Sequence, residues 1–168
     1  MRTYASSNER RAARSAGPAA LRIEYREFGK LRPMDWLEVP IRVRYGETDQ
    51  MGHAYYANYL YWFEVARGDW CRSRGFTYKS LEEQGYFLPV VEAWVRYRGE
   101  VRYDDEIVVR IRLAEVRRAS LKFEYRIYNS TTAQETTEGY TWHVLMGKQR
   151  KAVTIPQEIR RLLGIPNA

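Results

Sequence analysis

Alternation of apolar and polar residues is the dominant pattern of the chain, and it predicts β-strands. In 106–116 the apolar residues fall on every second position, and 39–45 and 121–128 show the same period. A period of two places one set of side chains on a buried face of a sheet. The stretches 86–98 and 134–146 are rich in apolar and aromatic residues and are also expected to be strands.

A different pattern runs from residue 56 or 57 to residue 73 and predicts one long helix. Four apolar residues recur at spacings of four, three and four and therefore share a helical face: Tyr59, Phe63, Ala66 and Trp70. Further apolar residues lie between them, so little of this helix is expected to face water. Shorter helices are predicted over 77–84 and 156–163.

The order of these elements predicts an α+β fold. A long helix cannot pass through a sheet of hairpins, so an antiparallel sheet of about five strands is expected to wrap around it. Residues 34–168 are expected to form this single domain. Residues 1–33 are expected to be a basic, mobile N-terminal extension, which is either a solvated tail, a segment like an organelle transit peptide, or sequence before a true start at Met34.

Composition and charge narrow the function classes. The net charge is +7. Residues 1–33 hold eight Lys or Arg and three Asp or Glu, so the domain is nearly balanced, which argues against a nucleic-acid-binding face. No apolar run approaches the ~20 residues that a membrane helix needs. The single cysteine, Cys71, favours a reducing cytoplasm and is expected to be a buried, inert thiol. Two histidines are too few for a typical zinc site.

The candidate chemistry lies in a polar turn between strand 39–45 and the long helix. Asp49 stands seven residues before Tyr56, and Gly52 allows a tight bend between them. Asp is common in turns for backbone reasons alone. Residue types by themselves therefore favour a turn-forming Asp49.

The turn and the helix start resemble the 4-hydroxybenzoyl-CoA thioesterase-like family of hot-dog fold proteins. The pattern D-x-x-G-x-x-Y-Y-x-N-Y followed by W-F-E-x-x-R is fairly specific as a set, although its D-x-x-G core alone is weak. The order of elements matches over 39–163. The matching residues are Tyr45, Thr48, Asp49, Gly52, Tyr55, Tyr56, Asn58, Tyr59, Phe63, Glu64 and Arg67.

The resemblance implies a five-stranded sheet around the long helix and protomers paired side by side, as dimers or tetramers. It also implies acyl-CoA thioester hydrolysis in a cleft at the dimer interface. By position, Asp49 is the catalytic carboxylate, and the backbone N–H of Tyr56 polarises the thioester carbonyl. His53 is a departure, because many relatives have Val or Ile there, and this leaves the acyl preference open.

This chemistry has a physical basis in the two groups. Thioester hydrolysis needs a carboxylate that attacks the carbonyl or deprotonates a water molecule. It also needs a positive field where the oxyanion develops, and the first N–H groups of a helix have no intrahelical partner and supply such a field. Whether Asp49 is a nucleophile or a general base stays open.

Other residues of the stretch have two interpretations each. His53 is either a structural or gating residue or a catalytic, substrate-contacting one. Asn58 either bonds the loop or binds substrate. Glu64 either pairs with Arg67 one turn along the helix or is a spare catalytic carboxylate.

Coenzyme A carries a diphosphate and a 3′-phosphate, so Arg and Lys are expected at the mouth of the cleft. By resemblance, Arg117, Arg118 and Ser120 are the substrate-binding candidates. Arg150 and Lys151 are weaker ones, and each of these side chains has a simpler interpretation as a solvated surface charge. Coenzyme A enters as part of the substrate, so we expect no cofactor and no metal.

Two other functions fit the same residues. A non-catalytic acyl-CoA-binding module keeps the fold and senses ligand. A hot-dog enoyl-CoA hydratase or dehydratase pairs a His with an acid, for which His53 and Glu64 are the candidates. Under all these hypotheses we expect acyl-CoA and further copies of the chain as partners, and neither nucleic acid nor membrane.

Overall fold

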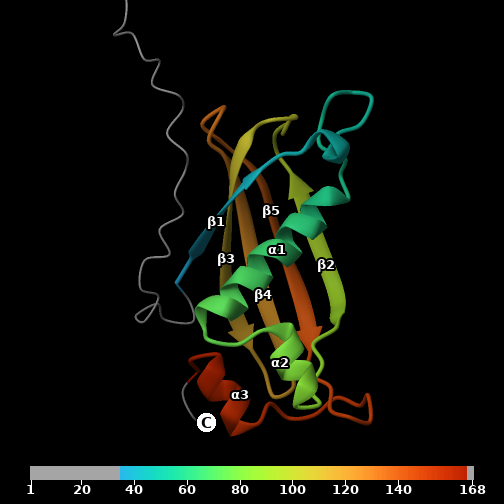
Figure 1. Cartoon of the computed structure of the whole chain (residues 1–168), viewed down its shortest axis with the longest axis vertical. Coiled ribbons are helices and arrows are strands. Elements are labelled where there is room, and N and C mark those ends of the chain that lie inside the picture. The colour runs from blue at the N-terminus through green and yellow to red at the C-terminus, as the bar shows by residue number, and fades with distance from the viewer. Residues whose placement is uncertain (1–34, 166–168) are drawn as a thin grey trace, which may run out of the picture.

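The alternating stretches of the sequence form one antiparallel sheet. The computed structural model describes residues 35–165. Its strands lie in the order β1-β3-β4-β5-β2, so β1 and β2 are the edges (Figure 1). The predicted α+β class with about five strands is confirmed. The strands are β1 (Leu37–Arg42), β2 (Val90–Tyr97), β3 (Glu106–Val116), β4 (Ser120–Asn129) and β5 (Gln134–Val144).

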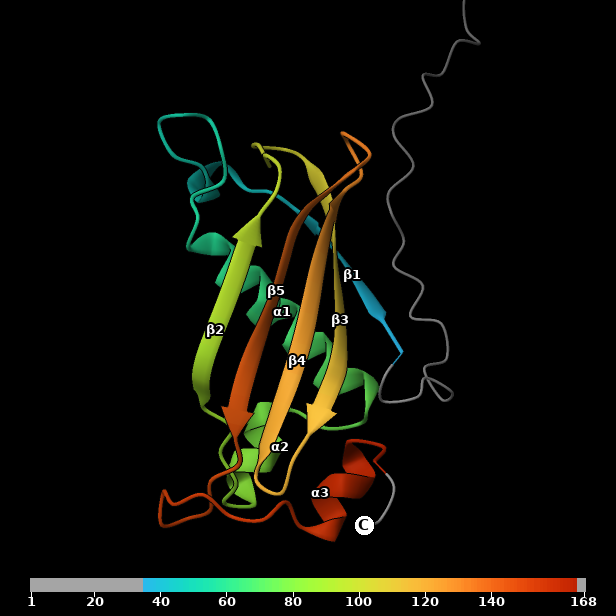
Figure 2. The ribbon, with the colours of Figure 1, turned by 180° about the vertical axis from the view of Figure 1, so that it is seen from behind.

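Helix α1 (Asn58–Ser73) lies across one face of this sheet. It passes in front of the strands in Figure 1 and behind them in Figure 2. Burial of each large apolar side chain on its sheet side is worth roughly 1.5–3 kcal/mol. Its other side is open, because Leu60, Tyr61 and Val65 are 41%, 63% and 46% exposed. The expectation that little of this helix faces water is therefore wrong for a single chain. The buried apolar residues of α1 are Tyr59, Trp62, Phe63, Ala66, Trp70 and Cys71.

Close approach of α1 to the sheet depends on Gly139 in β5. A Cβ at this position would stand 2.6 Å from the Phe63 ring and 2.7 Å from the carbonyl oxygen of Trp94. The space that Gly139 leaves is used by Phe63, whose ring stacks on Tyr125 with centroids 4.1 Å apart. The helix and the sheet are thus in contact at van der Waals distance in the middle of the core.

Arg67 is a buried cation between α1 and the sheet. Its Nε donates to the hydroxyl of Tyr78 at 2.6 Å, and its Nη1 donates to the hydroxyl of Tyr125 at 3.0 Å. Glu64, one turn earlier, is exposed. The expected Glu64–Arg67 ion pair is therefore wrong, because tertiary contacts with two tyrosines replace the pairing along the helix.

The Tyr125 hydroxyl continues a buried chain of hydrogen bonds. It lies 3.0 Å from Thr141 Oγ1, which lies 2.8 Å from His143 Nε2, and His143 Nδ1 lies 3.1 Å from the carbonyl oxygen of Leu88. A carbonyl only accepts, so Nδ1 carries the proton and Nε2 accepts from Thr141. Burial, with the nearby charge of Arg67, lowers the pKa of His143 to about 4 and keeps it neutral.

The short helices confirm their sequence signals. α2 (Tyr78–Glu83) begins after a Thr77 cap whose side chain accepts from the backbone N–H of Ser80, and Gly85 follows its end with φ +87°. Burial raises the pKa of the Cys71 thiol to about 12, which fits the expected inert thiol.

α3 (Gln157–Leu162) closes the described chain, with Pro156 directly before it. The strands at 86–98 and 134–146 are shorter than predicted, because Phe87 and Met146 form only an isolated bridge. The expected extension 1–33 lies outside the described residues. Within 35–165 no helix is long and apolar enough to cross a membrane.

Candidate active site

A hydrogen-bonded turn holds Asp49 in the loop that leads to α1. The Asp49 N–H donates to the carbonyl of His53 at 2.9 Å, and the Gly52 N–H donates to the carbonyl of Asp49 at 2.9 Å. Gly52 has φ +77°, a conformation that suits glycine. Thr48 and Ala54 form a bridge at the base of the turn. The predicted tight bend at Gly52 is confirmed.

The Asp49 carboxylate is only partly committed to this turn. It is half-buried, and its Oδ1 accepts from the backbone N–H of Met51 at 2.9 Å. No donor to Oδ2 is found among residues 35–165. A carboxylate offers about four lone-pair sites. Asp49 therefore combines a fixed backbone with an oxygen that is available to a substrate or to a water molecule.

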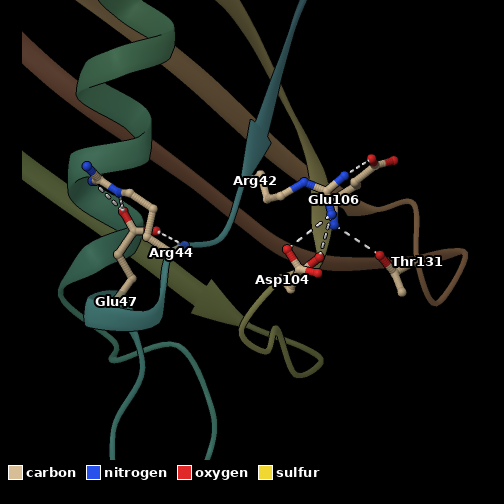
Figure 3. A network of polar contacts seen from close by, with 6 residues as sticks. All are labelled: Arg42, Arg44, Glu47, Asp104, Glu106 and Thr131. Atoms are coloured by element: carbon tan, nitrogen blue, oxygen red, sulfur yellow. Dashed lines mark hydrogen bonds and ion pairs between the residues drawn. The ribbon is translucent and has the colours of Figure 1, made fainter. Parts of the chain in front are cut away.

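Glu47, two residues earlier, has the opposite environment. It is 6% exposed, and its two oxygens accept from the Arg44 side chain, the Arg44 backbone N–H and the Trp62 indole. Burial alone would raise its pKa, but the hydrogen bonds from Arg44 and Trp62 and the Arg44 charge outweigh burial and lower it. Figure 3 shows the Arg44–Glu47 pair beside the ribbon of the helix. No separate role for Glu47 is predicted from the sequence.

The start of α1 carries N–H groups that are not capped. The helix begins at Asn58 after Ala57, and no side chain caps it. Tyr56 thus lies two residues before the helix, which corrects the expectation that the helix begins at residue 56 or 57. Within 35–165 no acceptor is found for the N–H groups of Tyr56, Ala57 and Tyr59. The positive end of the helix dipole is therefore open at this point.

Tyrosines surround this helix start. The Tyr97 hydroxyl, from β2, donates to the carbonyl of Tyr56 at 2.8 Å. The rings of Tyr55 and Tyr56 are in contact with centroids 4.4 Å apart. The pKa of Tyr55 is raised, first by its hydrogen bond to Tyr56 and in smaller part by the negative charge of Asp49. Among these tyrosines, Tyr55 is thus the one on which the Asp49 charge has a minor effect.

The remaining candidates of the motif are resolved one by one. Asn58 Nδ2 donates to the carbonyl of Glu47 at 2.7 Å, which is the loop bond considered for it, and its substrate contact stays a prediction. His53 Nε2 lies 3.2 Å from a carboxylate oxygen of Glu100, and Arg102 bonds the same oxygen. His53 therefore meets Glu100 rather than Glu64, the acid suggested for a hydratase.

The basic candidates lie at the other end of the sheet. Arg117 donates through its backbone N–H to the carbonyl of Ser120 at 2.8 Å, which closes the β3–β4 turn. Both figures place this turn at the end of the sheet opposite to the Asp49 turn. Arg118 is exposed, and the side chain of Arg150 lies over the ring of Phe87 at 3.8 Å from its centroid. Lys151 is exposed in the same loop.

One chain thus does not bring its basic turn to Asp49. Two arginines at the Asp49 end of the sheet were not predicted as site residues, and each meets an acid. Arg42 bonds Asp104 and Glu106 (Figure 3), and Arg44 bonds Glu47. No local signal marks the Arg42 pairs, because their partners lie more than 60 residues away, whereas Glu47 lies only three residues after Arg44. In residues 35–165 no group of His, Cys, Asp or Glu side chains could hold a metal ion.

Comparison with known proteins identifies the family. The profile of the thioesterase-like superfamily matches residues 43–163. The acyl-CoA thioesterase YbgC of Haemophilus influenzae is 34% identical over 122 residues, which are 72% of this chain and 89% of that protein.

Solved structures give the same result. A protein of Thermus thermophilus superposes with a TM-score of 0.71 at 36% identity, covering 75% of this chain and 95% of the other. The DHNA-CoA thioesterase of Staphylococcus aureus superposes with a TM-score of 0.68 at 31% identity, covering 71% and 80%. The expected family and its hot-dog fold are confirmed. The chain belongs to the thioesterase-like superfamily.

Proposed function

We propose that this protein is an acyl-CoA thioester hydrolase in which Asp49 supplies the reacting carboxylate. One observation carries the assignment: a carboxylate with an uncommitted oxygen lies in a turn that is bonded to an uncapped helix start. Membership of the thioesterase-like superfamily and the acyl-CoA thioesterases among its relatives support it.

The chemistry follows from these two groups. The thioester carbonyl oxygen accepts from the Tyr56 N–H, which stabilises the negative charge that forms when the carbonyl is attacked. A donor of this kind is worth roughly 3 kcal/mol in the transition state. Asp49 either attacks the carbonyl carbon, giving an acyl-enzyme anhydride that water then hydrolyses, or takes a proton from the attacking water. In both routes the C–S bond breaks and coenzyme A leaves as a thiolate. It becomes the thiol by taking a proton from water in the first route, or the proton that Asp49 accepted in the second.

A second copy of the chain completes the site in this proposal. β2 is an edge strand, and it leaves Val90, Val91, Trp94 and Tyr97 between 41% and 59% exposed. An exposed apolar edge of this kind invites pairing with another strand. Two β2 strands related by a two-fold axis pair antiparallel, which turns the second copy end for end.

That reversal has a direct consequence for the substrate. It places the Arg117–Ser120 turn of the second copy at the same end of the joined sheet as Asp49. The basic turn then receives the coenzyme A phosphates while Asp49 acts on the thioester. Arg117, Arg118 and Ser120 thus keep their proposed role, and Arg150 and Lys151 assist from the neighbouring loop.

Substitution of Asp49 tests the assignment. Asp49→Asn keeps the shape and the Met51 bond but removes the charge, so release of thiol from a panel of acyl-CoAs should fall at least ~100-fold. Glu64→Gln, on an exposed face of α1, is the matched control and should stay near wild type. Near-normal hydrolysis by Asp49→Asn would refute the proposal, and loss of activity in Glu64→Gln instead would move the reacting carboxylate to the helix.

Assays of the wild-type protein with acyl-CoA and enoyl-CoA separate the other hypotheses. A binding module would hold acyl-CoA tightly and release no thiol even as wild type. A hydratase would add water to an enoyl-CoA. A cytoplasmic location, the absence of a cofactor and the lack of nucleic-acid or membrane partners also stay predictions.

A further inference from the structure

We propose that Glu47 is a positioning residue, whose buried carboxylate ties the Asp49 turn to α1 and so sets where the Asp49 oxygen lies. The inference rests on the proposed function, because it concerns the placement of the proposed catalytic group. Glu47 takes no direct part in the proposed hydrolysis, which uses Asp49 and the Tyr56 N–H.

The contacts of Glu47 require an ionised carboxylate. Oε1 accepts from Trp62 Nε1 at 3.2 Å and from Nε and Nη2 of Arg44 at 3.1 and 2.7 Å, and Oε2 accepts from the Arg44 backbone N–H at 2.8 Å. All four groups are obligate donors. A neutral amide in this place would direct its own N–H at one of them.

The same residue is also held through its backbone. Its carbonyl accepts from the N–H of Tyr55 at 2.8 Å and from Nδ2 of Asn58 at 2.7 Å. Glu47 therefore contacts the segment before α1, its first residue, and its second turn through Trp62. No other residue of the turn is bonded to all three.

Burial separates this role from catalysis. Glu47 is 6% exposed and its oxygens are occupied, whereas Asp49 is half-buried and has an oxygen to spare. Asp49 follows two residues later, a span of at most ~7 Å. A shift of Glu47 against α1 therefore passes directly to the Asp49 carboxylate, and misplacement by ~1 Å can cost ~100-fold in rate.

The decisive variant is Glu47→Gln, which keeps the size of the side chain. We expect kcat per folded molecule to fall ~10- to 100-fold, while KM changes less than ~3-fold because the substrate-binding groups remain. Folded protein is quantified by circular dichroism, and kcat and KM come from thiol release.

Arg44→Gln is the second variant. It changes an exposed side chain, so the packing of the core stays the same and the variant should fold. The Arg44 side chain is 80% exposed, yet it supplies two of the four donors. We expect a fall in kcat of several-fold, and combination with Glu47→Gln should add little further loss, since both changes act through one contact.

Glu106→Gln is the matched control. Its carboxylate also bonds an arginine at the same end of the sheet, but it is 46% exposed, and within residues 35–165 it forms no hydrogen bond or ion pair with α1. It should leave kcat and KM unchanged.

The outcomes separate this inference from the proposed function. If Glu47→Gln only lowers the folded fraction and leaves kcat per folded molecule unchanged, Glu47 is merely structural and the inference is wrong. It is equally wrong if the loss appears in KM alone or if Glu106→Gln loses as much kcat. If Asp49→Asn is active, the proposed function itself fails, whatever the Glu47 variants do.

Discussion

The two ends of the sheet carry their charges differently. At the Asp49 end, Arg42, Arg44 and Arg102 each bond a carboxylate. At the other end, Arg117 bonds Glu115, but Arg118 and Lys151 form no ion pair with any residue of the described range, and neither do Lys148, Arg160 and Arg161. An anion that approaches the first end competes with acids already in place, whereas the second end offers free cations. A single chain therefore separates Asp49, the proposed reacting carboxylate, from the unpaired cations that are proposed to bind the anionic substrate.

The largest expected effect comes from breaking the β2 edge. Val91 is 59% exposed, so Val91→Asp should not disturb the core. In a dimer the introduced carboxylate would be buried between the two β2 strands and would oppose their pairing. Activity should then fall at least ~100-fold, because in a single chain Asp49 and the Arg117–Ser120 turn lie at opposite ends of the sheet. Sedimentation and thiol release measure both properties. Tyr128→Asp, on β4, should still dimerise, and an active Val91→Asp monomer would contradict a composite site.

Mixing two defective variants, assayed at an acyl-CoA concentration well below KM, tests the composite site directly. Asp49→Asn retains its basic turn, and the double variant Arg117→Ala, Arg118→Ala retains Asp49. In a mixed dimer, one of the two sites regains both parts. After random exchange of subunits, activity should recover to about a quarter of wild type, as two-fold symmetry requires. No recovery, despite mixed dimers detected by mass spectrometry, would place both parts of each site in one chain.

A smaller effect is expected on KM, and it should differ between a cation without an ion pair, Arg118, and a cation with one, Arg102. Arg118→Ala should raise KM for acyl-CoA about tenfold and leave kcat nearly unchanged, as expected for one lost charge-assisted phosphate contact. Arg102→Ala should change KM little, because Glu100 already neutralises that side chain. Steady-state kinetics with a short acyl-CoA measure KM for both variants. Equal changes in KM would contradict the proposed difference in anion binding between the two ends of the sheet.

The smallest effect on function is a pH dependence of stability that comes from His143, a buried residue close to the basic β3–β4 turn. His143 pairs with Leu121 near the β3–β4 turn, and its folded pKa is about 4 against an ordinary 6.5. Below pH 6.5 the unfolded chain binds a proton that the folded chain refuses, so stability falls as pH drops from 6.5 to 4. The loss reaches ~3 kcal/mol for this group. His143→Gln should flatten that part of the curve of denaturant unfolding against pH, and an unchanged slope would show that other groups cause it.

Much of the fold could be predicted because its signals are local. Alternation identified three of the strands, apolar and aromatic richness identified the other two, and helical spacing identified α1. Gly52 marked a bend that the structure confirms with positive φ. These features depend on residues within a few positions of each other, which is what a linear pattern contains.

The site was predicted less completely, because its supports are not local. The helical pairing rule favoured Glu64 as the partner of Arg67, but two tyrosines from α2 and β4 take that place. In the sequence, Glu47 is one polar residue among several in the turn. Its contact with α1 depends on Trp62, which lies 15 residues away and donates to its carboxylate. Tyr97 reaches Tyr56 across 41 residues.

The buried chain from Arg67 to Leu88 has a consequence for how faithfully the molecule folds. It joins α1, β4, β5 and the segment that enters β2, and each member must donate in the same direction. A strand that slipped by one residue would carry Tyr125 or Thr141 to the outer face and strand a guanidinium in the core. Incorrect alignments are thereby penalised by the lost hydrogen bonds of a buried cation as well as by poorer packing, so the core disfavours misfolded alternatives.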